Sequence, residues 1–499
     1  ISACLVGSEM CIRDSIYNMV TTEIHVWKNE EKLDKEITIN SFNYYISLFD
    51  KKINDKESVI ETTNSLNNDL HAMGVDESKR SQFVGSLLVA LNNHLSFSDD
   101  LETKEIIERI KEILKSKIEF DENKKTKTQL LINILNEQQI REIRNTDFCK
   151  LLNKIKKELI PFIDNTTSDG EDLLNLFFTT FNKYVGKADK NQAFTPTHVT
   201  DFMCEIVNVN KNSRVLDPTC GSGAFLVQAL SKMIKNAEGD EQKKLNIKKK
   251  QIFGIEREEK AFGLATTNML IHEDGKSNVI NKSCFDQKEW IQEQDINVVL
   301  MNPPFNGQKM PNDCPTDKKK TDTTKGFYFV KFIADTVNKG KLATVLPLSC
   351  AIGSDKAIAK IKKEILEKHT LKAVFSMNDE IFYPGASVNT CIMLFELGIP
   401  HDEKTPTFFG YYKDDGFIKK KNKGRIEVKD WKVTKEKWLE LFRFSKEEPG
   451  FSVKKCVTAN HEWLAEAYME TDYSKLTEND FIQVIRDFIA FKVKNGDIK

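Results

Sequence analysis

The clearest chemical signal in the sequence is an Asn-Pro-Pro-Phe run that begins at Asn302 and follows the apolar stretch 298–301. The side-chain oxygen of Asn302 and the carbonyl oxygen of Pro303 can both accept hydrogens from an exocyclic amine such as N6 of adenine. The rings of Pro303 and Pro304 fix φ and hold that carbonyl in place before a substrate arrives. Phe305 adds an aromatic face, on which a stacked base gains about 1–3 kcal/mol. These residues predict methylation of a base amine; the alternative is a plain turn after a strand.

A base inside a duplex must be flipped out before its amine can reach such a turn, at a cost of roughly a few kcal/mol. Stacking on Phe305 offsets this cost, so that alignment of the reacting atoms supplies the rate. Methylation at C5 of cytosine is disfavoured, because it needs a nucleophilic Cys where Asn302 stands.

A glycine-rich segment upstream predicts the cofactor site. It runs from Asp217 to Gly223 with the sequence Asp-Pro-Thr-Cys-Gly-Ser-Gly. Gly221 and Gly223 allow the backbone to approach a ligand closely, and the helix expected after them offers free N–H groups. A dinucleotide site would have a third glycine where Leu226 stands, and the sequence lacks the glycine-lysine run of an ATP-binding loop. The segment therefore favours S-adenosylmethionine, with Asp217 either accepting from the methionine ammonium or capping the loop.

Two acids follow neighbouring expected strands. Glu256 ends the strand expected at 252–255, where it is placed to accept from both ribose hydroxyls of the cofactor. Asp286 follows a short strand expected at 279–280, and Phe285 precedes it. We expect Phe285 to stack on the cofactor's adenine and Asp286 to accept from it. The alternatives are a solvated surface glutamate and an ordinary loop aspartate.

Two lysine-rich stretches are candidates for contact with substrate phosphates. Residues 307–325 are polar and follow the catalytic turn directly, which predicts a mobile loop that closes over the substrate, or else a solvated insertion. A second basic run includes Lys419, Lys420 and Arg425, and such a run is more often simply solvated.

Bulk composition limits the class of protein. A chain of 499 residues with 40% hydrophobic residues is long enough for two or three domains. With a formal net charge of −1, any DNA-binding surface must be local or come partly from a partner. The 10 cysteines include no Cys-x-x-Cys pair, which disfavours a zinc site and fits a reducing cytoplasm. No apolar run reaches the roughly 18 residues that span a bilayer, so a soluble protein is expected.

The first part of the chain predicts a helical domain behind an unusual leader. Residues 1–15 lack both an initiating Met and the charged start of a signal peptide, and we interpret them as non-native. From 16 to 165, Gly and Pro are scarce, and apolar residues recur at three- and four-residue spacing, as in 83–91 and 106–114. This pattern predicts amphipathic helices throughout 16–165, serving interaction or acting as helical filler.

Beyond a loop-like cluster near position 165, short apolar runs alternate with helical stretches. The expected strands lie at 214–216, 252–255, 279–280, 298–300, 342–346, 371–375 and 390–395. The expected helices between them lie at 224–235, 261–271, 327–337 and 358–367. This alternation predicts a mostly parallel sheet covered on both faces, with a catalytic domain at 166–400. Residues 401–499 form a lysine-rich, partly helical C-terminal segment with Trp431, Trp438 and Trp463 as expected anchors.

Over about 170–400, these motifs in this order resemble the modification (N6-adenine methyltransferase) subunits of type I restriction–modification systems. Phe194, Thr195 and Pro196 resemble the Phe-Thr-Pro motif that precedes the glycine loop in that family and helps to cradle the methionine end of the cofactor. The segment 382–387 resembles the late motif that lines the target-base pocket. The two central motifs, at 217–223 and 302–305, match the cofactor and catalytic motifs.

The resemblance implies an α/β, Rossmann-like fold with an all-α N-terminal domain, which uses S-adenosylmethionine to methylate N6 of a flipped adenine in double-stranded DNA. It also implies a specificity subunit as partner, and in some assemblies a restriction subunit. Three alternatives stay open: a fragment of a single-chain restriction–modification enzyme, a methyltransferase acting on RNA or a protein glutamine, and a scaffold without catalysis.

Overall fold

The computed structural model divides the chain into two compact units, Ile1–Asp55 and Lys56–Lys499. The residues that it describes are 15–18, 23–28, 31–32, 56–117, 129, 131–160, 195–271, 278–305, 310–311, 314, 322–353, 355–383, 388–420, 424–470 and 477–494. Phe194, the loop cluster near position 165, most of 307–325, and 384–387 of the late motif lie outside these residues.

The described residues of the first unit form a three-stranded antiparallel sheet. Its strands are β1 (Ser15–Asn18), β2 (Glu23–Lys28) and β3 (Glu31–Lys32). The prediction of helix throughout 16–165 is therefore wrong in this stretch. In β2, the β-branched residues Ile24 and Val26 flank the polar His25, and Trp27 follows, so that β-branched and aromatic residues favour a strand here.

The second unit begins with the predicted helices. Their buried faces share one core, in which Phe83 and Phe148 lie with ring centroids 6.2 Å apart. The helices are α2 (Lys56–Ala72), α3 (Glu77–Asn92), α4 (Thr103–Lys117), α6 (Gln138–Arg141) and α7 (Asn145–Glu158). The helical prediction is thus confirmed over the described part of 56–160.

One helix of the catalytic domain joins the helical layer to the sheet. In α12 (Glu259–Ile271), every residue from 261 to 271 is buried. Phe262 belongs to the core beneath the sheet, whereas Leu264 belongs to the core of the N-terminal helices. Gly85 of α3 faces α12 so closely that a Cβ atom there would lie 2.8 Å from Cγ2 of Thr267.

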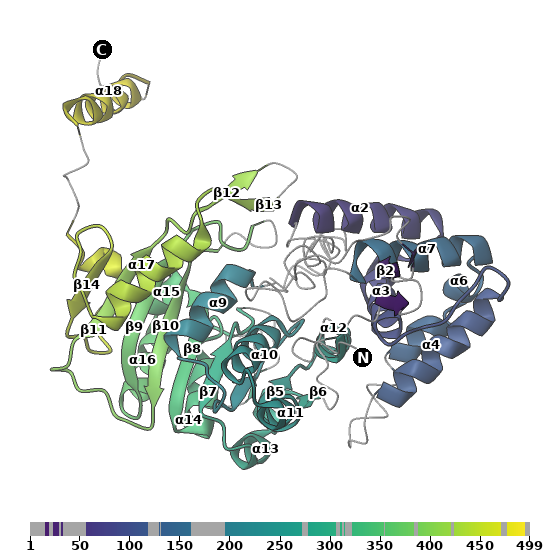
Figure 1. The fold of residues 1–499 in the computed structure, drawn as a ribbon. Coiled ribbons are helices and arrows are strands. Elements are labelled where there is room, and N and C mark those ends of the chain that lie inside the picture. Colours follow the sequence, from purple (N-terminus) through teal and green to yellow (C-terminus); the bar gives the residue numbers. More distant parts are fainter. Residues whose placement is uncertain are drawn as a thin grey trace. The chain divides into compact units, whose positions relative to one another are not determined.

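The described residues of the second unit also build a nine-stranded sheet in the order β14-β11-β9-β10-β8-β7-β4-β5-β6 (Figure 1). Only β10 and β14 run antiparallel to their neighbours, so the prediction of a mostly parallel sheet is confirmed. The strands are β4 (Val215–Asp217), β5 (Ile252–Ile255), β6 (Asn278–Ile280), β7 (Val298–Met301), β8 (Gly340–Pro347), β9 (Thr370–Met377), β10 (Thr390–Leu397), β11 (Thr407–Tyr412) and β14 (Ser452–Lys455).

Helices cover both faces of this sheet, because its central strands are apolar on both sides. In β7, Val298 and Leu300 belong to one core, and Val299 and Met301 belong to the other. The first core is closed by α9 (Thr197–Ile206), α10 (Ala224–Asn236) and α17 (Trp431–Arg443). The second is closed by α13 (Lys288–Glu293), α14 (Phe327–Val337) and α16 (Lys356–Leu366).

The region after 400 is part of the same fold. Strands β11 and β14 extend the sheet, so the boundary predicted at 400 does not mark its end. Trp431, Trp438 and Trp463 are buried, as predicted for anchors. A hairpin of β12 (Phe417–Lys420) and β13 (Gly424–Glu427) and a last helix, α18 (Glu478–Lys494), complete the described chain.

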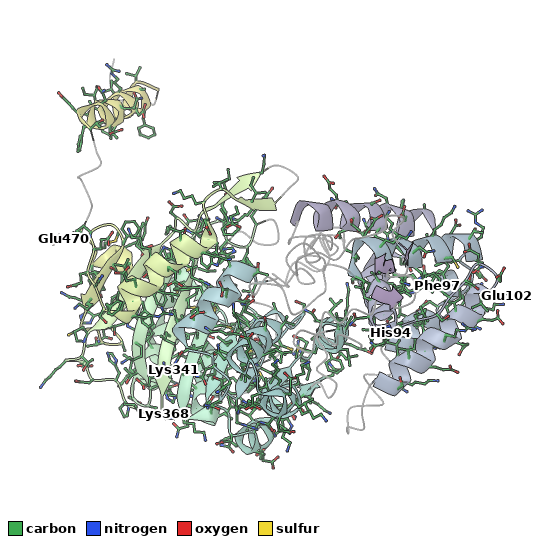
Figure 2. All side chains as sticks on the ribbon, in the orientation of Figure 1. His94, Phe97, Glu102, Lys341, Lys368 and Glu470 are labelled. Atoms are coloured by element: carbon green, nitrogen blue, oxygen red, sulfur yellow. The ribbon has the colours of Figure 1, made fainter. Side chains whose placement is uncertain are left out.

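Strand order places the candidate site at one edge of the sheet. Strand β4 lies between β5 and β7, so the chain proceeds to one side after β4 and later to the other, and ligands bind at such a switch point, beyond the carboxyl ends of the strands. Lys341 and Lys368 lie by the amino ends of β8 and β9 and mark the opposite edge (Figure 2). Among the described helices, none is both long and apolar enough to cross a membrane.

Candidate active site

Three of the predicted cofactor residues, Asp217, Gly221 and Glu256, lie together at the carboxyl ends of β4 and β5. Glu256 follows β5, and its carboxylate accepts from the backbone N–H of Gly221 at 2.9 Å and from that of Glu258 at 2.7 Å. It is therefore not the solvated glutamate of the alternative reading. Asp217 ends β4, is 1% exposed, and accepts from the N–H of Thr219 at 3.1 Å. The structure thus gives Asp217 the loop-capping contact, and its role toward a methionine ammonium stays a prediction.

Burial dominates the electrostatics of these two acids. It raises the pKa of Asp217 well above its usual value, and the nearby Glu256 adds to the rise, while the N–H of Thr219 opposes it. Burial likewise raises the pKa of Glu256, against the hydrogen bonds from Glu258 and Gly221. Two desolvated carboxyl groups side by side are stabilised by a ligand that brings hydroxyl or ammonium donors.

The glycine loop has the backbone that its sequence predicts. Gly221 and Gly223 have φ of +53° and +86°, in the left-handed region that favours glycine. Leu226, which stands where a dinucleotide site has its third glycine, packs on Gly254 of β5, where a Cβ atom would lie 2.7 Å from Cδ1 of Leu226. The close helix–strand approach is therefore retained, with the glycine on the strand instead of the helix.

The loop has room for a ligand, and two polar atoms at or beside it have no hydrogen-bond partner. Apart from its neighbours in the chain, no atom of the described residues lies within 4 Å of the place where a Cβ atom on Gly221 would be. Among the described residues, the buried hydroxyl of Thr219 has no hydrogen-bond partner, nor has the side-chain oxygen of Asn268, whose amide nitrogen donates to the Ser222 carbonyl at 3.2 Å. These features fit a polar, adenosine-bearing cofactor. Sequence reasoning missed Asn268, because a polar residue within a buried helix gives no motif.

The third predicted acid is less engaged. Asp286 ends the short helix η4 (Cys284–Asp286) after β6 and is exposed. Phe285 packs on α14, with its ring centroid 4.5 Å from that of Phe329 and 5.1 Å from that of Phe332. The stacking of Phe285 on adenine and the adenine role of Asp286 therefore both stay predictions.

The catalytic turn follows β7 as predicted, and a distant segment holds its amide. Nδ2 of Asn302 donates to Oγ1 of Thr195 at 3.1 Å. With the nitrogen engaged, the side-chain oxygen of Asn302 is the acceptor that remains for an incoming amine. Pro303 is buried, while Asn302 and Phe305 are half-buried, as the faces that meet a substrate must be. The Phe-Thr-Pro motif thus touches the catalytic turn through Thr195.

A second segment, around Gly326, packs against the backbone of the catalytic turn. Asp322 is buried and accepts from the N–H of Thr324 at 2.7 Å and from that of Gly326 at 2.9 Å. Gly326 has φ of +88°, and a Cβ atom on it would lie 3.0 Å from the carbonyl oxygen of Pro304 and 3.3 Å from Cγ of Pro303. The end of the predicted mobile stretch 307–325 is therefore fixed against the catalytic turn, a role that sequence reasoning missed.

In the second basic run, Lys419 and Lys420 are exposed, whereas the side chain of Arg425 is buried and held by an ion pair. Arg425, whose side chain is 6% exposed, binds both carboxylate oxygens of Asp415, at 2.6 and 2.7 Å. Nε2 of His198 lies 3.2 Å from the same carboxylate. Burial alone would raise the pKa of Asp415, but the hydrogen bonds from His198 and Arg425 outweigh it and hold the pKa at about 2. The expectation of a solvated run is wrong for Arg425.

Lys419 of the same hairpin reaches the late motif. Its Nζ lies 3.1 Å from a carboxylate oxygen of Glu380 and 4.2 Å from the ring centroid of Tyr383. Phe382 is buried in the core below. The hairpin and the described part of the late motif therefore lie together.

Among the described residues, no group of His, Cys, Asp or Glu could hold a metal ion.

Comparisons with known proteins bear on the family and the fold of this chain. The family model for N-6 DNA methylases matches residues 171–479, more than half of the chain. The type II restriction enzyme and methyltransferase RM.BcgI of Heyndrickxia coagulans is 33% identical over 330 residues, which are 64% of this chain and 50% of that protein. The methylase subunit of the type I restriction enzyme EcoEI of Escherichia coli is 29% identical over 42% of this chain and 43% of its own length. The chain spans about half the length of these relatives.

Solved structures share the fold. The modification subunit of a putative type I restriction enzyme from Vibrio vulnificus YJ016 superposes with a TM-score of 0.57 at 17% identity, covering 81% of this chain and 93% of that one. A structure reported for complex assembly of the type I R-M system has a TM-score of 0.56 at 15% identity, over 88% and 98% of the two chains. With the family match over the sheet, the glycine loop and the Asn-Pro-Pro-Phe turn, this chain belongs to the N-6 DNA methylase family.

Proposed function

We propose that this chain transfers a methyl group from S-adenosylmethionine to N6 of an adenine flipped out of duplex DNA, as the modification component of a restriction–modification system. The observation that carries the proposal is the orientation of Asn302. Its amide nitrogen is taken up by Thr195, so its oxygen is available to an amine, and it lies at the same sheet edge as the glycine loop.

The cofactor, when bound, supplies an electrophilic methyl group on a sulfonium. Glu256, with Asp217 beside it, offers desolvated carboxylates to the donors of such a ligand, and the backbone of Gly221 leaves it space. The residues present therefore fit S-adenosylmethionine, and the family match supports the same class of cofactor.

The catalytic turn acts on the amine. The lone pair on N6 of adenine is delocalised into the ring, and hydrogen bonds from both N6 hydrogens to fixed acceptors localise it on the nitrogen. The side-chain oxygen of Asn302 and the carbonyl of Pro303 are those acceptors. Since both are set before the substrate arrives, little reorganisation is needed in the transition state. The half-buried Phe305 stacks on the base.

Recognition of a DNA sequence is assigned to a partner. The chain has a formal net charge of −1, so a specificity subunit supplies much of the DNA contact, and a restriction subunit joins in some assemblies. Modification of host DNA places this activity in the cytoplasm.

A second organisation has an observation in its favour. The 33% identical relative, matched over 64% of this chain, is named as both restriction enzyme and methyltransferase. The same methyltransferase domain would then be one part of a single-chain restriction–modification enzyme. The chemistry at Asn302 is the same in either organisation.

The test is nucleoside mass spectrometry of DNA from cells that express this chain with its neighbouring genes, followed by methylome sequencing. The proposal predicts N6-methyladenine at one recognition sequence and its loss in Asn302→Ala. Methylation of RNA or of protein glutamine without DNA methylation would support the alternative substrates. Absence of methyl transfer to any of the three would contradict catalysis altogether.

A further inference from the structure

The contact between Thr195 and Asn302 links segments that are 107 residues apart in the sequence. Thr195 is 7% exposed and accepts from Nδ2 of Asn302 at 3.1 Å. The resemblance in sequence gave the Phe-Thr-Pro segment a role toward the cofactor. The geometry gives its threonine a contact with the group that would hold the target amine.

The orientation of this amide matters for the proposed reaction. A primary amide has an acceptor oxygen and a donor nitrogen of similar size, and a half-turn about χ2 exchanges them. If the nitrogen of Asn302 faced the substrate, a donor would meet the N6 hydrogens, which are also donors. In the structure, the hydroxyl of Thr195 binds the nitrogen, and this orientation leaves the oxygen of Asn302 for the amine.

The backbone that carries Thr195 is well fixed, so it can act as a rigid support. Pro196 is the N-terminal cap residue of α9. On α9, His198 stacks on Phe417 of the hairpin with ring centroids 4.2 Å apart. One turn further, Asp201 accepts from Nε1 of Trp431 at 2.9 Å and from Nζ of Lys435 at 2.8 Å.

We propose that Thr195 is a positioning residue for methyl transfer: its hydroxyl holds the amide of Asn302 with the oxygen toward the target amine, and the anchored helix α9 holds Thr195. This inference rests on the proposed function and deepens it. It differs from a cofactor-cradling role, because it predicts an effect on the rate of transfer at saturating cofactor and no effect on cofactor affinity.

The test compares substitutions that differ by a hydroxyl group. Thr195→Val removes the hydroxyl and keeps the shape, whereas Thr195→Ser keeps it. Thr200→Val is the matched control, because Thr200 is also buried, lies on α9, and donates to the Thr197 carbonyl at 2.9 Å rather than to the site. Single-turnover methylation of DNA is measured at saturating cofactor, in the full chain with its partner, and cofactor Kd is measured by calorimetry.

We expect Thr195→Val to lower the single-turnover rate about tenfold, and Thr195→Ser and Thr200→Val to stay within about twofold of wild type. Cofactor Kd should change less than about twofold in all three. An unchanged rate in Thr195→Val would overturn the inference. An equal loss of cofactor affinity would assign the hydroxyl to the cofactor instead.

A second pair of variants and a parallel assay of the wild type keep the inference testable. If Thr195→Val does not fold, as judged by circular dichroism and thermal unfolding, Thr195→Ala is compared with Thr195→Ser, since these two differ by one oxygen atom. A rate for Ala equal to that for Ser would then contradict the inference. Wild-type protein is assayed in parallel for N6-methyladenine, so a failure of the proposed function is seen there and not confused with a failure at Thr195.

Discussion

The two halves of the candidate site are built differently. The cofactor half comes from adjacent strands and the loops directly after them, with Glu256 bonded to the N–H of Gly221 at 2.9 Å. The amine half has Asn302 at its centre, but its supports come from Thr195, far upstream, and from Gly326, in the loop before α14. One half is therefore a local motif, and the other is assembled by the tertiary fold.

This difference predicts two classes of defect. Changes in the local half should act on cofactor affinity, because its atoms face the ligand. Changes in the supports of the amine half should act on the rate of transfer, because a misplacement of about 1 Å in a reacting group costs roughly 10²-fold in rate. Each substitution below tests this division.

The largest effect on cofactor affinity is expected from Gly223→Asp. Gly223 has φ of +86°, where a residue with a side chain is strained by about 1–2 kcal/mol, and the new charge would join Asp217 and Glu256. We expect cofactor affinity to fall about 100-fold or more by calorimetry. Gly239→Asp is the matched control, since φ there is +82° and, within the described part of the chain, nothing lies within 4 Å of its Cβ position. Equal affinity in both variants would contradict the role of the loop.

Gly326→Ala should break the amine half alone. The added Cβ atom would lie 3.0 Å from the Pro304 carbonyl oxygen, so either the turn or the loop must shift. We expect kcat to fall about 10- to 100-fold, with cofactor Kd unchanged. Gly74 has a comparable φ of +76°, and none of the atoms that the structure describes lies within 4 Å of its Cβ position, so Gly74→Ala controls for backbone strain. A change in cofactor Kd as large as the change in kcat would contradict the division of the site into a cofactor half and an amine half.

Glu256→Gln should weaken the local half without destroying it. A glutamine has one oxygen for the two backbone donors at Gly221 and Glu258, so one N–H would face the amide nitrogen. We expect cofactor Kd to rise about tenfold and kcat at saturation to stay close to wild type. Burial raises the pKa of Glu256. As the pH is lowered, the affinity of the wild type for the cofactor should therefore begin to fall at a higher pH than it would with a glutamate of ordinary pKa. If cofactor affinity depended on pH in the same way in Glu256→Gln and in the wild type, the carboxylate would have no role in cofactor binding.

The smallest effect on activity is expected from Lys362→Met, which tests a remote support of the amine half. Lys362 is fully buried, and its Nζ donates to the carbonyl of Ala351 at 3.0 Å. Ala351 lies in α15 (Leu348–Ile352), where Cys350 contacts the Thr324 carbonyl at 3.6 Å. A change of about twofold or less in kcat is expected, because several contacts separate Lys362 from the turn.

The same residue gives a pH test of stability. Burial lowers the pKa of Lys362 from 10.5 to about 8. Between these values, the unfolded chain binds more protons than the folded one, so the stability of the wild type should rise with pH in this window. Relative to Lys362→Met, we expect a gain of about 2 kcal/mol between pH 7.5 and 9.5 in chemical denaturation. A pH-independent difference would mean that Lys362 stays charged when buried.

The sheet and its helices could largely be predicted from the sequence. The bounds expected for β5 and α14 agree with the structure, because each is a continuous apolar run with clear ends. Strand β11 was missed. It contains Gly410, which looks like a strand breaker, but a Cβ atom there would lie 2.9 Å from the ring of Phe375, so the close packing favours glycine.

The site could be predicted in part, for the same reason that its halves differ. Asp217 ends β4 and Glu256 directly follows β5, and these two strands are adjacent and parallel. The spacing of apolar residues along the sequence and the order of the strands were enough to predict that the two acids lie together. The contacts of Asn302 with Thr195 and of Gly326 with Pro304 depend on how the chain folds back over long separations. No local pattern signals such contacts, so they needed the structure.

The most direct test of the proposed function is a paired measurement on Asn302→Ala: single-turnover transfer to adenine N6, with cofactor Kd by calorimetry. We predict that the transfer rate falls at least about 10²–10³-fold, while Kd stays within about twofold of wild type. A normal rate, or a loss of cofactor affinity equal to the loss of rate, would contradict it.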